Sequence, residues 1–157
     1  MIEETILEAA GLQKHYSPRR GLWGSVLLKR RLMVRAVDGV DFRVSQKSIS
    51  GLAGESGCGK TTTGKLLTLL ETPSAGTIFL RKEEITTLDA KRLKEIRKSI
   101  QMIFQDPYES LNPRYKVGNA IEEPLQVHQI GSREERHNAV CQSLEHVGLE
   151  PPEQFLE

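Results

Sequence analysis

This chain has 157 residues, 38% of them hydrophobic and 27% charged, a length and balance that exclude wholesale disorder and allow one buried core. Its longest apolar runs are only a few residues, far below the roughly 20 that a membrane helix needs. Cys58 and Cys141 form neither a metal-ligand spacing nor a disulfide framework.

The net charge of +1 is unevenly distributed along the chain. Six basic residues and no acidic residue lie in the segment 17–35, and the other residues carry 16 basic against 21 acidic side chains, a net charge of −5. Because this remainder is mildly acidic, nucleic acid is disfavoured as the main partner.

The first part of the chain predicts several short strands. Apolar residues predict a strand over 4–12, and alternation of apolar and polar residues predicts a half-buried strand over 36–44. A further candidate over 48–53 runs directly into a glycine-rich loop. The runs 77–80 and 100–104 predict two more strands.

Helical spacing of apolar residues follows that loop and returns in the last third of the chain. Leu66, Leu67 and Leu70 share one side of a helix predicted up to Leu70, which Pro73 ends. Further helices are predicted over 90–99, over 117–127 with an interruption at Pro124, and over 132–147. Strands alternating with helices predict an α/β fold.

The glycine-rich loop matches the spacing G-x-x-x-x-G-K-[ST] at Gly54, Gly59, Lys60 and Thr61. Glycines allow the backbone to turn with positive φ, so that successive N–H groups form a nest for an anion. The helix N-terminus adds its free N–H groups, Lys60 a charge for the β- and γ-phosphates, and the Thr61 hydroxyl a ligand for Mg²⁺. The loop therefore predicts binding of a nucleoside triphosphate, with Cys58 as a small unreactive filler.

Two stretches resemble one known family. The run Gly51-Leu-Ala-Gly-Glu-Ser-Gly-Cys-Gly-Lys-Thr-Thr62 closely resembles the Walker A region of ABC-transporter ATPases. The run Gln101-Met-Ile-Phe-Gln-Asp-Pro-Tyr-Glu-Ser-Leu-Asn-Pro-Arg114 is similar to the Q-loop of the ATPase subunits of oligopeptide, dipeptide and nickel importers. This resemblance extends from about Leu7 to the last residue.

The resemblance implies further site residues. Tyr16 corresponds to the A-loop aromatic that stacks on adenine, and Gln105 to the glutamine that contacts Mg²⁺ or the attacking water, which an amide suits. Thr61 and Gln105 are thus the implied metal ligands, and ATP with Mg²⁺ the implied ligand. The complete expected binding set is Tyr16, Gly54, Glu55, Ser56, Gly57, Cys58, Gly59, Lys60, Thr61, Thr62 and Gln105.

The implied fold is the P-loop NTPase fold of ABC ATPases: N-terminal antiparallel strands, a P-loop strand and helix, and part of the helical subdomain. Residues 1–106 are expected to form the nucleotide-binding core, with 17–35 as a basic insertion that either contacts lipid head groups or a partner, or is a solvated loop. Residues 107–157 are expected to begin the helical subdomain.

Part of the family pattern is absent from this sequence. The Leu-Ser-Gly-Gly-Gln signature, the Walker B aspartate, the glutamate base and the switch histidine do not occur. We therefore expect an incomplete sheet, a marginal core and no catalytic residue, since hydrolysis needs a base and charge stabilisation from both faces of the nucleotide. Phosphate release above that of a Lys60→Ala control would contradict this. At Lys47 the family usually has a glycine turn.

The partners implied by the resemblance are transmembrane permease subunits and a second ATPase subunit, on the inner face of the cell membrane. Two alternatives are a DNA-repair type of ABC ATPase and a nucleotide-binding remnant without coupled activity. The acidic balance and the importer-like Q-loop disfavour the DNA-repair type. A small kinase or GTPase is disfavoured because neither an arginine-rich lid nor an Asn-Lys-x-Asp motif occurs.

Overall fold

A computed structural model describes residues 4–17, 33–106, 112 and 114–156. The chain is divided into two compact units, Met1–Met102 and Ile103–Glu157. Most of the predicted basic insertion, including Trp23, lies outside the described residues, as do positions 107–111 and 113 of the Q-loop resemblance. Among the described helices, none is long and apolar enough to cross a bilayer.

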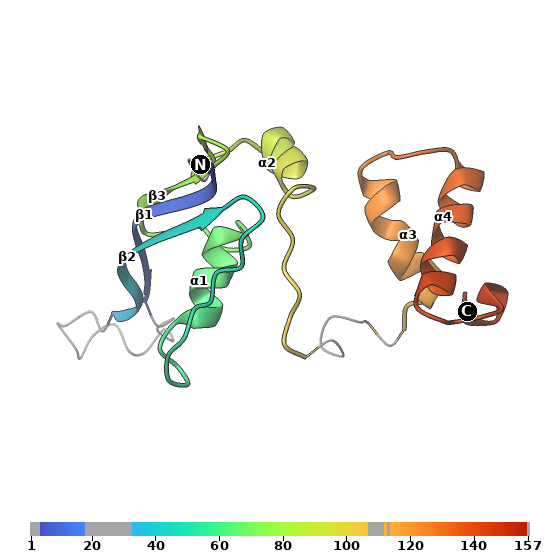
Figure 1. Ribbon diagram of the computed structural model, residues 1–157, viewed down its shortest axis with the longest axis horizontal. Coiled ribbons are helices and arrows are strands. Elements are labelled where there is room, and N and C mark those ends of the chain that lie inside the picture. The colour runs from blue at the N-terminus through green and yellow to red at the C-terminus, as the bar shows by residue number, and fades with distance from the viewer. Residues whose placement is uncertain (1–3, 18–32, 107–111, 113, 157) are drawn as a thin grey trace, which may run out of the picture. The chain divides into compact units, whose positions relative to one another are not determined.

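The first unit contains a four-stranded antiparallel sheet (Figure 1). Its strands are β1 (Thr5–Tyr16), β2 (Val34–Ser45), β3 (Ala75–Leu80) and β4 (Glu83–Glu84). They are ordered β2-β1-β3-β4, so β1 is hydrogen-bonded on both sides. The predicted first strand thus exists and continues beyond its predicted end to Tyr16, where it pairs with Val34.

The described residues of this unit also form the helices α1 (Lys60–Leu67) and α2 (Ala90–Ile96). The buried side of α1 carries Leu66 and Leu67, as the apolar spacing predicted, but the helix ends before Leu70, which is 46% exposed. Apolar residues of the sheet, of α1, of α2 and of the segment after β4 form one core: Ala9, Leu12, Val37, Leu66, Leu67, Ile78, Leu80, Ile85 and Ile96. This core fixes α1 against the sheet.

The second unit contains α3 (Val117–Val127), α4 (Arg133–His146) and the short 3₁₀ helix η2 (Pro152–Phe155). Val140 and Leu144 are its buried apolar residues on α4. The two helices are joined by an ion pair from Arg136 Nε to Glu122 Oε1 at 2.9 Å.

The predicted interruption of α3 at Pro124 is wrong, because the helix runs through this residue to Val127. Proline removes a single backbone donor, and the carbonyl of Pro124 still accepts a hydrogen bond from the His128 N–H at 3.1 Å. The next turn of the helix is therefore retained.

Two predicted strands are wrong as well. Residues 48–53 and 100–104 form no strand, and Ile49 and Ile103 are 101% and 95% exposed. A strand is stable only where a neighbouring strand pairs with its backbone N–H and C=O groups. None of the four described strands pairs with either segment, so Ile49 and Ile103 remain in solvent, although Ile100 packs against the core.

Candidate nucleotide-binding site

The phosphate loop has the backbone conformation that its glycines predicted. Gly57 and Gly59 have φ of 81° and 96°, in the region that favours glycine. Gly59 also lies against β2: a Cβ atom at this position would be only 2.2 Å from the carbonyl oxygen of Ala36. Gly59 therefore combines an unusual dihedral angle with a close approach of two backbones.

Helix α1 begins directly after Gly59, and the N–H groups of a helix point toward its N-terminal end. The N-cap residue of α1 is Gly59, which has no side chain to cap the helix, and the first helical bond is the one from Thr63 N–H to Gly59 O at 2.8 Å. In a helix that begins at Lys60, the N–H groups of Lys60, Thr61 and Thr62 have no carbonyl of the preceding turn to bind. They are available to an anion, which the helix dipole also favours.

The ammonium group of Lys60 is hydrogen-bonded to the backbone of the phosphate loop. Its Nζ donates to the carbonyl oxygens of Gly54 at 2.7 Å and Glu55 at 2.6 Å, and lies 3.6 Å from the Cys58 sulfur. The positive charge is therefore already placed inside the loop, bound to neutral acceptors. Phosphate oxygens are stronger acceptors for it, because a hydrogen bond between two charged groups is stronger than one to a neutral carbonyl.

Cys58 packs against the start of the loop. A Cβ atom at Gly54 would lie 2.6 Å from the Cys58 sulfur, so the thiol fills the space that a side chain at Gly54 would need. This is the structural role expected of Cys58 as a filler. Glu55, Ser56 and Thr61 are exposed, which leaves their side chains accessible to a ligand.

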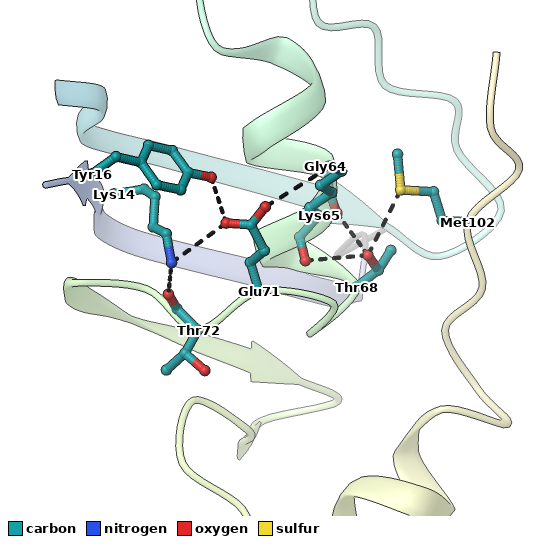
Figure 2. A network of polar contacts seen from close by, with 8 residues as sticks. All are labelled: Lys14, Tyr16, Gly64, Lys65, Thr68, Glu71, Thr72 and Met102. Atoms are coloured by element: carbon teal, nitrogen blue, oxygen red, sulfur yellow. Dashed lines mark hydrogen bonds and ion pairs between the residues drawn. The ribbon is translucent and has the colours of Figure 1, made fainter. Parts of the chain in front are cut away.

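Tyr16, the predicted adenine-stacking residue, lies at the end of β1 and reaches α1. Its hydroxyl donates a hydrogen bond to Glu71 Oε2 (Figure 2). This bond to Glu71, with desolvation, raises the pKa of the Tyr16 phenol, while a hydrogen bond with the Thr62 side chain lowers it. The structure therefore brings Tyr16 next to Thr62 in the first turn of the helix that follows the phosphate loop.

Gln105, the other predicted ligand, is exposed and belongs to the second unit. Its role beside Thr61 at a metal ion stays a prediction.

Sequence reasoning missed two residues beside Tyr16. Lys14 lies two residues earlier on β1, and Glu71 follows α1; their side chains are 3.4 Å apart, from Nζ to Oε2. The sequence indicates only that the Tyr16 hydroxyl can donate a hydrogen bond. The position of its partner, 55 residues away, could not be read from the sequence.

These residues fit a nucleotide with its Mg²⁺. The loop and the first turn of α1 offer N–H groups and an ammonium to phosphates and an exposed Thr61 hydroxyl to a metal, and Tyr16 on β1 offers a ring to a base. The family model that matches this sequence is "ABC transporter", over residues 37–156. The chain belongs to the ABC transporter family.

Curated members of the family resemble it along most of its length. It is 40% identical over 148 residues to the di/tripeptide transport ATP-binding protein DppF of Pseudomonas aeruginosa and 38% identical to the dipeptide transport ATP-binding protein DppF of Escherichia coli. It is 40% identical over 151 residues to the oligopeptide transport ATP-binding protein AppF of Bacillus subtilis. These matches cover 94–95% of this chain but only 43–44% of the relatives, so the chain spans less than half of their length.

Solved structures support the fold. The dimeric ATP-binding cassette MJ0796, in a post-hydrolysis state with ADP and Pi, matches with a TM-score of 0.74 over 96% of this chain and 60% of its own, at 23% identity. A second dimeric structure of MJ0796, described as a bacterial ABC transporter cassette, gives a TM-score of 0.75 over 97% of this chain. The P-loop fold of ABC ATPases predicted from the resemblance is confirmed.

Proposed function

We propose that this chain binds ATP with Mg²⁺ as the nucleotide-binding part of an energy-coupling subunit of an importer for oligopeptides, dipeptides or nickel. The observation that carries the proposal is the phosphate loop. Its glycines have positive φ, the N-terminus of α1 is uncapped, and the Lys60 ammonium is placed within the loop. The peptide-transport names of the relatives support the importer class.

Binding would begin with an exchange of partners at Lys60. Its ammonium leaves the carbonyls of Gly54 and Glu55 for the β- and γ-phosphates, and the N–H groups at the start of α1 bind phosphate oxygens. Thr61 and Gln105 would hold the Mg²⁺, which neutralises the charge of the β- and γ-phosphates. The ring of Tyr16 would stack on adenine, and its 37% exposure leaves room for that contact.

The assignment as an importer subunit implies partners. Transmembrane permease subunits and a second ATPase subunit would complete the transporter on the inner face of the membrane, and the second unit, with α3 and α4, would belong to the helical subdomain. The dimer of cassettes in MJ0796 is consistent with a second ATPase subunit.

Calorimetry with the 157-residue chain tests the nucleotide part of this proposal. We expect saturable binding of ATP with Mg²⁺, weakened by Lys60→Ala about 10- to 100-fold, because hydrogen bonds to charged groups contribute roughly 1.5–3 kcal/mol. The matched control is Lys94→Ala on α2, outside the loop, with affinity within about twofold of the parent. Equal affinities for ATP in the parent and Lys60→Ala would contradict the proposal.

The importer part is tested in Escherichia coli with a chimera. This chain replaces the matching 148 residues of the dipeptide transport protein to which it is 38% identical. We expect the chimera to restore dipeptide uptake in a strain without that protein and the Lys60→Ala chimera to fail. A chimera that is present at normal levels and binds ATP but gives no uptake would contradict the importer assignment.

A further inference from the structure

Glu71 connects the two parts of the candidate site. It follows α1, and its carboxylate is bound by groups from two different elements (Figure 2). The Tyr16 hydroxyl and the Lys14 ammonium reach it from the end of β1, and the Lys65 ammonium lies 3.9 Å away on α1. One carboxylate thus joins the predicted base-binding residue to the helix that begins at the phosphate loop.

Lys14 holds this arrangement from the other side. Its ammonium donates to the Thr72 carbonyl at 2.7 Å and lies 3.4 Å from Glu71 Oε2. The same ammonium lies 5.2 Å from the centre of the Tyr16 ring, within cation–π range. One face of the ring is therefore occupied by Lys14, and a base has the opposite face for stacking.

The backbone alone does not orient this ring. Tyr16 is the last residue of β1, and its strand pairing with Val34 fixes only the Cα end of the side chain. Tyr16 is 37% exposed, so packing covers only part of its side chain. The hydroxyl bond to Glu71 fixes the far end of the side chain.

We propose that Glu71, held in place by Lys14, is a positioning residue that orients the Tyr16 ring for stacking on the nucleotide base. The inference rests on the proposed ATP-binding function and extends it to a residue outside the predicted binding set. Glu71 itself touches no phosphate and no base in this proposal. Its effect reaches the base only through the Tyr16 hydroxyl, and it depends on both residues being present.

The alternative is that Glu71 only joins β1 to α1 as a surface ion pair. The two possibilities predict different effects on the binding of the base and on the binding of the phosphates. A positioning residue affects the binding of ATP but not of inorganic tripolyphosphate, which has no base. A purely structural contact affects both ligands equally or neither, because the phosphate loop begins the same helix.

The experiment compares ATP and tripolyphosphate, each with Mg²⁺, by calorimetry in the full chain. For Glu71→Ala we expect ATP affinity to fall about fivefold to tenfold, a fraction of what base–aromatic stacking contributes, with tripolyphosphate unchanged within about twofold. Tyr16→Phe keeps the ring but loses the hydroxyl, so it should cause the same selective loss. Adding Glu71→Ala to Tyr16→Phe should cause no further loss. Glu84→Ala, an exposed glutamate on β4, is the control.

Several results would overturn the inference. These are an unchanged ATP affinity in Glu71→Ala, an equal loss for both ligands, or an additive loss in the double variant. Glu71→Gln keeps an acceptor for the Tyr16 hydroxyl and tests the inference even if Glu71→Ala does not fold. Its ATP affinity should lie between those of the parent and Glu71→Ala. A parent that binds ATP and tripolyphosphate equally overturns this inference alone, whereas a parent that binds neither overturns the proposed function as well.

Discussion

Replacement of glycine by alanine at two positions of the phosphate loop and its helix should have opposite effects on stability. At Gly59, φ is 96° and the new Cβ would lie 2.2 Å from the Ala36 carbonyl oxygen. At Gly64, five residues later and inside α1, the nearest atom to a new Cβ is the Met102 Cε at 3.5 Å, an ordinary contact. The same chemical change therefore meets a backbone carbonyl at one site and an ordinary contact with a flexible side chain at the other.

The expected magnitudes follow from these geometries. An alanine at the φ of Gly59 costs of order 1–3 kcal/mol in backbone strain, and the contact with the Ala36 carbonyl requires β2 or the loop to move, which adds to it. We expect Gly59→Ala to lower the free energy of unfolding by at least about 2 kcal/mol. For Gly64→Ala we expect a gain of up to about 1 kcal/mol, the difference in helix propensity between the two residues.

Thermal and urea unfolding followed by far-ultraviolet circular dichroism would measure both variants. For a chain of this size, 1 kcal/mol corresponds to roughly 2–4 °C in Tm, so the variants should differ by about 4 °C or more. Gly59→Ala should also lose ATP affinity, whereas Gly64→Ala should keep it. Changes of the same sign in both variants, or a Gly59→Ala protein as stable as the parent, would refute this reasoning about the loop.

Three further outcomes are expected. Lys47 has a φ of 60°, so Lys47→Gly should raise the free energy of unfolding by about 0.5–1 kcal/mol in urea titrations, whereas Lys47→Ala should not, since it keeps the Cβ. Ser132 caps α4 in a capping box, so Ser132→Ala should cost about 1 kcal/mol; Ser143→Ala, inside the same helix, should cost little, and equal losses would contradict the cap. The Tyr16 hydroxyl, followed by Lys14 and Lys65, holds the pKa of the Glu71 carboxyl below its ordinary value. This stabilisation is present at neutral pH and is lost as the pH falls below about 5, so the parent's advantage over Glu71→Gln should vanish in acid unfolding curves; an advantage independent of pH would contradict it.

The proposed exchange of partners at Lys60 would limit the affinity for phosphates. Two of the three N–H donors of its ammonium are already bound to loop carbonyls, at 2.7 and 2.6 Å, so the proposed move to the phosphates would give up these bonds. The loop is thus preorganised in its backbone but not in its lysine. Part of the interaction energy with the phosphates replaces bonds that already exist, as in any exchange of one acceptor for another.

Sequence patterns predict a feature correctly where the residues that form it lie close together in the chain. The phosphate loop was found from four residues, because its spacing reflects the geometry of a single turn and helix. The ends of α3 agree with the apolar pattern, and those of α4 lie one residue inside the prediction. Ser132 and Glu135 form the capping box that begins α4, a contact between residues only three positions apart.

Only the tertiary structure decided the questions that depend on distant residues. The apolar runs 48–53 and 100–104 have the composition of strands, but a strand also needs a partner, which neither has among the described strands. The contact of Tyr16 with Glu71 joins residues 55 positions apart. The backbone of Gly59 in the phosphate loop lies against the backbone of Ala36 on β2. The sequence by itself determined the chemistry of the phosphate loop, because that chemistry is local. The structure determined which side chains orient the residues around it, since those contacts form only when β1, β2 and α1 pack together.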